Sequence, residues 1–195
     1  MDIAIAGLAL LFLLPLMIGL AIATWLGDPG PIFFGHMRVG KNGRGFRCFK
    51  FRTMVQDAEE RLLRHLESDP AARGEWERDR KLTNDPRITG IGRFMRKSSL
   101  DELPQLWNVL RGDMSLIGPR PIVQAEVPRY GRYIADYMMA RPGISGLWQI
   151  SGRNDVSYRR RVALDVAFAR SQSVKLYLRI LVLTIPAVLL QRGSY

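Results

Sequence analysis

The sequence predicts an α+β protein that is mainly helical, with an N-terminal membrane helix, a small basic domain and interfacial amphipathic helices. Three observations lead to this prediction. No residue from position 3 to position 27 is charged, and every lysine and arginine lies at or after Arg38. The formal net charge of the 195 residues is +11. Helical patterns cover most of the basic part, whereas strand-like runs are few and short.

Residues 1–27 form the predicted membrane part. As a helix, residues 3–27 would be about 37 Å long, enough to cross a hydrocarbon core of about 30 Å. A secretory signal peptide would have a basic start and a shorter apolar run, and the remaining alternative is a buried helix of a soluble protein. Pro15 lies near the centre and bends a helix, because its ring removes a hydrogen bond. The segment therefore either spans with a kink or dips into one leaflet and returns, and the pattern alone favours neither.

Residues 28–195 form the basic domain, which we expect on the cytoplasmic side of the membrane because cytoplasmic segments are rich in lysine and arginine. Such a charge attracts polyanions: nucleic acid, an anionic bilayer or phosphorylated substrates. Cys48 is the only cysteine, so no internal disulfide can form. Its alternating surroundings, residues 46–51, indicate a packing role rather than a nucleophile.

Residues 174–190 are a second segment that could face the membrane. They are mostly apolar, with Lys175 and Arg179 on the first turns and Pro186 near the end. The segment is short for a span, so we expect an interfacial helix whose cations reach the headgroups. A helix packed on the protein core is an equally open alternative.

A β-hairpin follows the membrane part. The breaker Asp28-Pro29-Gly30-Pro31 ends the apolar segment. Residues 32–34 and 46–51 have strand character, and the glycine-rich residues 40–45 between them predict a turn with basic residues at its tip.

Most other segments have helical spacing. Residues 53–67, 122–139 and 157–171 are predicted helices. Residues 68–89 are polar and predict a loop or an irregular helix, and residues 147–150 predict a short strand.

Residues 88–97 are basic with helical spacing, and residues 98–110 predict an amphipathic helix. Its apolar stripe consists of Leu103, Leu106, Trp107 and Leu110. Ser99 and Glu102 have the spacing of a capping box, but that start would put Pro104 inside the helix. A start nearer Asp101 places the proline in the first turn. Either start puts both acidic residues at a helix N-terminus.

Adjacent carboxylates at a helix start often only cap free N–H groups. Here basic residues crowd the same region, which is also suited to bind phosphate. These residues are Arg93, Arg96, Lys97, Arg111 and Arg120. Because neighbouring helical positions point about 100° apart, Asp101 and Glu102 can take different tasks, one holding a metal while the other attacks phosphorus.

Six short motifs occur in order along the chain. They are Lys50-Phe51-Arg52-Thr53-Met54, Ser99-Leu100-Asp101-Glu102-Leu103-Pro104-Gln105, Gly112-Asp113-Met114-Ser115, Gly118-Pro119-Arg120-Pro121, Arg141-Pro142-Gly143-Ile144 and Ser151-Gly152-Arg153-Asn154. Together they resemble the bacterial sugar transferase family, the monotopic phosphoglycosyl transferases that start exopolysaccharide, O-antigen and glycoprotein glycan synthesis. Any one motif is weak, but six in order over nearly the whole chain are specific.

The resemblance implies an enzyme that transfers a sugar 1-phosphate from a UDP-sugar to undecaprenyl phosphate and releases UMP. Asp101 would be the nucleophile of a ping-pong reaction with a covalent phosphosugar intermediate. Glu102 would help to bind Mg²⁺, which offsets phosphate charge. The family works at the bacterial inner membrane with its catalytic domain facing the cytoplasm.

The resemblance also implies further site residues. Arg96 and Arg120 would clamp phosphates, since a planar guanidinium suits two phosphate oxygens. Lys50 and Asp165 match two more family positions, which we group with the phosphate-binding residues. The family's membrane helix is re-entrant and breaks at a proline, which would be Pro15.

This chain departs from the family in two places. Many relatives have serine before the proline, where this chain has Leu14, and many have basic residues before the apolar run. Because the chain begins at Met1-Asp2, a shortened form is one interpretation, which the sequence leaves open. Two segments are similar to those of family members that use glucose or galactose. They are the form of the segment from Trp148 to Arg153 and the C-terminal Arg192-Gly193-Ser194-Tyr195.

The alternative function is a non-catalytic membrane-surface scaffold or anionic-lipid-binding protein in polysaccharide assembly. We expect no nucleic-acid partner, because no recognition motif is present. A homo-oligomer stays open. The Asp101–Glu102 pair among arginines favours the enzyme.

Overall fold

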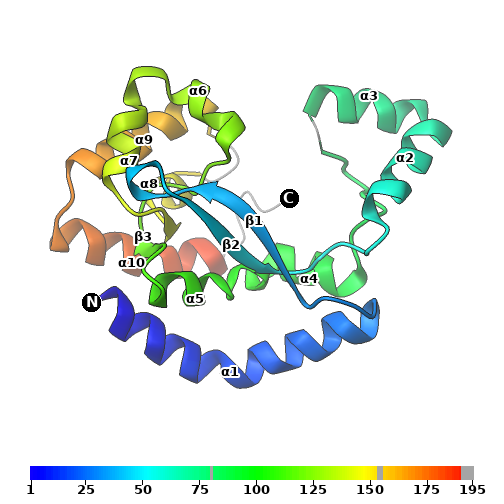
Figure 1. Ribbon diagram of the computed structural model, residues 1–195, viewed down its shortest axis with the longest axis horizontal. Coiled ribbons are helices and arrows are strands. Elements are labelled where there is room, and N and C mark those ends of the chain that lie inside the picture. The colour runs from blue at the N-terminus through cyan, green and yellow to red at the C-terminus, as the bar shows by residue number, and fades with distance from the viewer. Residues whose placement is uncertain (80, 153–155, 190–195) are drawn as a thin grey trace.

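The computed structural model describes residues 1–79, 81–152 and 156–189 (Figure 1). These residues are mostly helical and include two small sheets of two strands each, so the predicted α+β class is confirmed. Figure 1 shows helix α1 along one edge of the molecule, a β-hairpin across its middle, and helices α2 and α3 as an arm at one side. Arg153 and Asn154 of the last motif, residue 190 of the predicted interfacial helix and residues 192–195 lie outside the described residues.

Helix α1, Asp2–Gly27, confirms the predicted apolar helix. Its length and composition suffice to cross a membrane, with a mean hydropathy of 2.7 over its most apolar window. Most of its side chains are exposed, Phe12 to 84%. Pro15 lies inside the helix, and Figure 1 shows α1 bowed, with both ends rising toward the rest of the chain.

Carboxylates tie both ends of α1 to the body. Asp2 accepts hydrogen bonds from the Ser115 hydroxyl at 2.8 Å and from the Tyr177 hydroxyl at 2.5 Å. Asp28, the residue after α1, accepts a hydrogen bond from the Arg52 guanidinium and one from the backbone N–H of Gln56 at 3.1 Å. The two ends of the apolar helix therefore contact the same body.

Strands β1 (Phe33–Val39) and β2 (Gly45–Phe51) pair antiparallel, which confirms the predicted hairpin. The 3-10 turn Lys41–Gly43 joins them, and Asn42 has a φ of +57° there, a left-handed conformation that asparagine tolerates better than most residues. The register pairs His36 with Cys48 and Phe34 with Lys50. Since directly opposed residues lie on one face of a sheet, these side chains form a common surface.

The arm consists of α2 (Ala58–Ser68) and α3 (Pro70–Asp79). The predicted helix at 53–67 is wrong in its first turn. There the Thr53 carbonyl accepts a hydrogen bond from the Thr89 N–H at 3.1 Å, and the Val55 N–H donates to the Arg87 carbonyl at 2.9 Å. This pairing keeps the start of the segment extended.

Helix α4 (Gly90–Ser98) and helix α5 (Gln105–Leu110) flank the acidic pair. The predicted single helix at 98–110 and the capping box are wrong. Ser99 has a left-handed φ of +59° that ends α4, and Leu100–Glu102 form a 3-10 turn without a side-chain cap. Asp101 and Glu102 therefore lie in a tight turn between two helices.

The C-terminal half is irregular between its helices. Strands β3 (Ser115–Ile117) and β4 (Gly143–Ser145) pair in parallel. The predicted helix at 122–139 is broken into α6 (Val127–Tyr130) and α7 (Ile134–Met139) by 3-10 turns. The predicted strand at 147–150 is wrong: these residues form helix α8 (Leu147–Ile150).

The last two predicted helices are confirmed. Helix α9 (Tyr158–Arg170) begins after Ser157, whose hydroxyl accepts a hydrogen bond from the Arg160 N–H. Helix α10 (Val174–Leu189) packs on the core through one side, as one of its two alternatives predicts, and exposes apolar side chains on another. Ile180 is fully buried against the core, whereas Val174 and Val182 on the same helix are exposed.

Three apolar clusters hold these elements together. The first joins α1, α5, β3 and α10 around Val109 and Met114. The second lies under α7 and α9 around Tyr137, and the third joins α1, the hairpin and α4 through Leu20 and Met95. Each such buried side chain contributes about 1.5–3 kcal/mol. The first and third clusters pack α1 against the body.

Candidate active site

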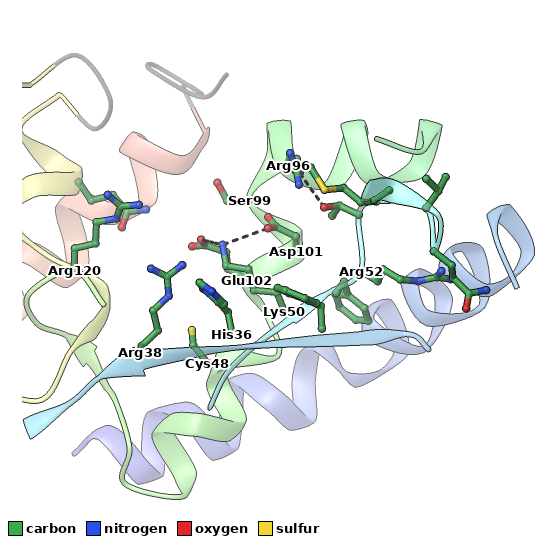
Figure 2. Close-up of a pocket in the computed structure, with 18 of the residues that line it drawn as sticks. His36, Arg38, Cys48, Lys50, Arg52, Arg96, Ser99, Asp101, Glu102 and Arg120 are labelled. Carbon is green, nitrogen blue, oxygen red and sulfur yellow. Dashed lines mark hydrogen bonds and ion pairs between the residues drawn. The ribbon is translucent and has the colours of Figure 1, made fainter. Parts of the chain in front are cut away.

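A cavity of about 630 Å³ lies where the hairpin, the turn with Asp101, and helices α4 and α8 meet (Figure 2). Polar side chains of the hairpin point into it from β1 and β2. Asp101, Glu102, Lys50, Arg96 and Arg120 all line it. The fold thus brings together five of the predicted site residues from distant parts of the sequence.

Lys50 stands between the two predicted catalytic carboxylates. Its Nζ lies 2.6 Å from Glu102 Oε1 and 3.5 Å from Asp101 Oδ2. Asp101 is only 8% exposed. A buried carboxylate needs a positive partner, and the ammonium group of Lys50 provides it.

The charges of this group depend on one another. Burial raises the pKa of the Asp101 carboxyl, Lys50 opposes that rise and Glu102 adds to it. Burial alone would lower the pKa of Lys50, but the carboxylates of Glu102 and Asp101 outweigh it, so this pKa is raised. Lys50 therefore keeps its charge and offsets two carboxylates that would otherwise repel each other.

Arg96 reaches the cavity from α4. Its Nε donates a hydrogen bond to the Thr53 hydroxyl at 2.8 Å, and burial lowers its pKa while Asp101 opposes that fall. Helix α4 approaches Thr53 this closely because of Gly92, where an added Cβ would lie 2.1 Å from the Thr53 carbonyl oxygen. Because Gly92 allows this approach, it determines where Arg96 of the same helix lies.

Arg120 and Asp165 have different positions relative to the cavity. Arg120 lines it, whereas Asp165 is 1% exposed inside the core on α9. Asp165 accepts hydrogen bonds from the Arg120 backbone N–H at 3.3 Å and from the Tyr130 hydroxyl at 2.7 Å. Burial raises its pKa to about 6. This geometry supports a role for Asp165 in positioning Arg120 and does not support direct contact between Asp165 and a substrate phosphate.

Two glycine-containing motifs meet behind Arg120. The Gly118 N–H donates to the Ser145 carbonyl, and the Gly143 N–H donates to the Pro119 carbonyl, both at 2.8 Å. A Cβ on Gly143 would lie 2.0 Å from the Gly118 nitrogen. The two distant motifs are therefore one packed unit that carries Arg120.

Sequence reasoning missed several residues of the cavity. They are His36, Arg38, Arg52, Trp148 and Gln149. The alternation of Phe34, His36 and Arg38 along β1 is a signal that could have placed the last two beside Lys50. Of the cations expected to crowd the acidic pair, Arg93, Lys97 and Arg111 are absent from the lining of the cavity in the described part of the chain.

Cys48 is buried beneath this surface, as its pattern predicts. Burial raises the pKa of its thiol to about 11. The thiolate is the reactive form of cysteine, so the structure supports a packing role.

The donor set is compatible with Mg²⁺ but would not form a complete protein site. The described residues contain no cluster of three or more carboxylate, histidine or cysteine ligands. Mg²⁺ is commonly held by one or two carboxylates together with substrate phosphates. Glu102, whose Oε1 accepts a hydrogen bond from Lys50 Nζ and which lines the cavity, can supply such a carboxylate.

Comparison with known proteins places the chain in a family. The family described as bacterial sugar transferase matches residues 1–191. The exopolysaccharide production protein ExoY of Sinorhizobium fredii is 50% identical over all of this chain and 86% of its own length. The undecaprenyl-phosphate galactose phosphotransferase of Salmonella typhimurium is 51% identical over all of this chain. The UDP-galactose-lipid carrier transferase of Erwinia amylovora is 55% identical over 86% of this chain.

The relatives differ in length. This chain spans 40% of the Salmonella protein and 35% of the Erwinia protein. The match over residues 1–191 includes α1, the hairpin and the acidic turn. The chain therefore belongs to the bacterial sugar transferase family and is an enzyme of the transferase class, as its ordered motifs predict.

Proposed function

We propose that the chain transfers a sugar 1-phosphate from a UDP-sugar to undecaprenyl phosphate, releases UMP, and so initiates the synthesis of an exopolysaccharide or a related glycan. One observation carries this proposal: a buried aspartate, Asp101, lies beside Lys50 in a cavity lined by arginines. A carboxylate in such a place is a nucleophile next to a phosphate-binding surface.

In the first step, an oxygen of Asp101 attacks the sugar-bearing phosphorus of the UDP-sugar. The bond from that phosphorus to the bridging oxygen breaks, and UMP leaves with the electron pair. An aspartyl phosphosugar remains. Lys50, Arg96 and Arg120 supply positive charge for the phosphate oxygens in the transition state.

In the second step, a phosphate oxygen of undecaprenyl phosphate attacks the same phosphorus. The bond to Asp101 breaks, and its carboxylate is restored. One substrate is dissolved in water and the other in lipid, so a covalent intermediate lets a single small cavity serve them in turn.

Mg²⁺ is the cofactor that we propose. When bound, it offsets negative charge on the phosphates of the donor. Glu102 is the residue to hold it, together with phosphate oxygens. Glu102 lines the cavity with 31% of its side chain exposed, which supports this role.

We place the enzyme at the bacterial inner membrane with its body on the cytoplasmic side. A spanning helix would separate its ends by about 30 Å of hydrocarbon, yet Asp2 and Asp28 both bond to the body. These contacts support a re-entrant α1 that bends near Pro15. Exposed apolar side chains on α10 support an interfacial position for this helix.

Labelling tests this topology. A variant with a cysteine inserted after Met1 and the variant Pro29→Cys, both made in a Cys48→Ala background, should react with an impermeant maleimide from the cytoplasmic face of inverted vesicles. Reaction of only one of them from that face would show that α1 spans.

Galactose or glucose is the sugar that we propose, since two relatives are named for galactose transfer. The direct test is UMP release from a panel of UDP-sugars with Mg²⁺ and undecaprenyl phosphate. Asp101→Asn should abolish release, whereas Asp136→Asn, which removes a surface carboxylate paired with Arg170, should not. Absence of release from every donor by folded protein would favour the scaffold alternative.

A further inference from the structure

Arg38 is a cation of the cavity to which no role has been given above. It lies on the face of β1 that points into the cavity, two residues after His36. Figure 2 shows Arg38 and Arg120 on one side of the Asp101–Glu102 pair and Arg96 on the other. The cavity therefore has a cationic group at each end, with the acidic pair between them.

The fold holds Arg38 beside Arg120. The Arg38 Nη1 donates to the Pro121 carbonyl at 3.3 Å. The next residue, Val39, donates its N–H to the Ile122 carbonyl at 2.9 Å, and its own carbonyl accepts from the Tyr137 hydroxyl at 2.9 Å. The end of β1 is thus fixed to the segment that carries Arg120, so the two guanidinium groups keep their relative position.

These two positive charges are close and poorly compensated. Burial lowers the pKa of Arg38, and Arg120 lowers it further. The nearest carboxylate contact of Arg38 among the described residues is Glu126 Oε2 at 3.9 Å, the outer limit of an ion pair. The negative charge of the Asp101–Glu102 pair is already compensated by Lys50. Two partly buried guanidinium groups that lie side by side are suited to bind an anion.

Neutral polar groups adjoin the same end of the cavity. The Arg120 guanidinium lies 5.7 Å from the centre of the Trp148 ring. Gln149 is 7% exposed, and its Oε1 is buried without a hydrogen-bond partner among the described residues, as is the Nε1 of Trp148. Buried polar atoms are rarely left unpaired. The acceptor of Gln149 and the indole of Trp148 with its own donor, neither of them paired within the described part of the chain, fit a ligand with a neutral polar ring, such as a nucleobase or a sugar.

The two ends also differ in their distance from the apolar helix. Arg96 comes from α4, whose Met95 packs in one cluster with Leu20 of α1. The end of β1 that carries Arg38 packs through Val39 into the cluster of Tyr130 and Tyr137, which contains no described residue of α1, although Phe46 of β2, opposite Arg38, packs in the cluster that includes Ala6 of α1. Arg96 therefore comes from a helix packed on α1, whereas the strand that carries Arg38 is anchored away from α1.

We propose that Arg38 and Arg120 together bind the phosphate of the nucleotide, with Trp148 and Gln149 on the neutral part of the donor beside it. Arg96, beyond the charge that it supplies in the first step, binds the phosphate of the lipid acceptor in the second. This assignment rests on the proposed function and adds Arg38 as a substrate-binding residue. It divides the cavity into a nucleotide end and a lipid end on either side of Asp101.

The test compares Arg38→Gln with Arg47→Gln in the full chain. Arg47 lies on the same hairpin and is exposed on the other face, so its variant removes the same charge without touching the cavity. Loss of a charge-assisted hydrogen bond costs about 1.5–3 kcal/mol. For Arg38→Gln we therefore expect the KM for the UDP-sugar and the Kd for UMP, measured by titration calorimetry, to rise by roughly 10- to 100-fold.

The acceptor provides the second readout. The KM for undecaprenyl phosphate should stay unchanged in Arg38→Gln and should rise in Arg96→Gln. Arg38→Lys keeps the charge without the fork of donors and should weaken UMP binding less, and it carries the test if Arg38→Gln does not fold. The inference is overturned if Arg38→Gln binds UMP as tightly as Arg47→Gln, or if it raises the KM for the acceptor instead. Failure of the wild-type chain to release UMP from any UDP-sugar would instead remove the proposed function.

Discussion

Lys50 and Glu102 form a 2.6 Å ion pair that joins the hairpin to the acidic turn, and the same ammonium group lies 3.5 Å from Asp101. This contact links the first two motifs of the sequence. Because the ammonium group compensates two adjacent carboxylates, it favours the ionised form of Asp101, the proposed nucleophile.

Replacing Lys50 by Met should reduce UMP release by about a hundredfold or more, because positive charge is lost where phosphate charge develops. Lys50→Arg should recover only part of the activity, since a guanidinium has a different shape. Lys41→Met, in the turn of the same hairpin and exposed, is the control. Equal activity of Lys50→Met and Lys41→Met would show that the ion pair is not needed for turnover.

The rate should depend on the ionisation of Asp101. The nucleophile is the carboxylate, so activity is lost as the pH falls through the pKa of Asp101. Burial raises this pKa, so the acidic limb of kcat/KM should lie above the ordinary aspartate value of about 3.9. The measurement is the pH profile of UMP release, and a limb at or below that value would contradict the assignment.

Gly92→Ala should displace α4 and with it Arg96. A Cβ at Gly92 would lie 2.1 Å from the Thr53 carbonyl oxygen, whereas one at Gly90 on the same helix meets nothing within 4 Å. We expect Gly92→Ala to lower the free energy of unfolding by about 1–3 kcal/mol and to impair turnover. Gly90→Ala should do neither. Equal unfolding temperatures for the two variants would contradict the close approach of α4 to Thr53.

Asp165→Asn should act through Arg120. The variant keeps the shape but loses the charged acceptor of the Arg120 N–H and the Tyr130 hydroxyl. We expect a rise of roughly tenfold in the donor KM with a smaller change in kcat. An unchanged donor KM in folded protein would limit Asp165 to a structural role.

Asp165 should also leave a signature in the pH dependence of stability. Its pKa of about 6 in the folded chain lies above the ordinary value of 3.8, so the folded state binds the proton more tightly than the unfolded state does. Wild-type stability should therefore gain, relative to Asp165→Asn, as the pH falls from 7 to 5. Thermal unfolding of both proteins at the two pH values measures this difference.

The sequence predicts the elements whose signals are local. The apolar run of α1, the alternation of the hairpin and the helical spacing of α9 are all visible in the sequence, because each depends on neighbouring residues only. The ordered motifs also located Asp101, Glu102 and Lys50, which meet in one cavity.

The features that the sequence did not predict depend on tertiary contacts. Residues 53–55 have helical spacing but pair with 87–89 as extended chain, and Ser99 takes a left-handed conformation instead of capping a helix. Arg38 was missed because the bridge between Val39 and Ile122 is what brings it beside Arg120. Such long-range contacts leave no periodic trace in the sequence.

The covalent intermediate is the most direct test of the proposed mechanism. The chain would be mixed with a UDP-sugar and Mg²⁺ without undecaprenyl phosphate, quenched, digested and analysed by mass spectrometry. The account predicts UMP release of no more than one equivalent per chain and a phosphosugar on the peptide that carries Asp101, both absent in Asp101→Asn. Release of UMP that strictly requires the acceptor, with no modified peptide at any time, would contradict it.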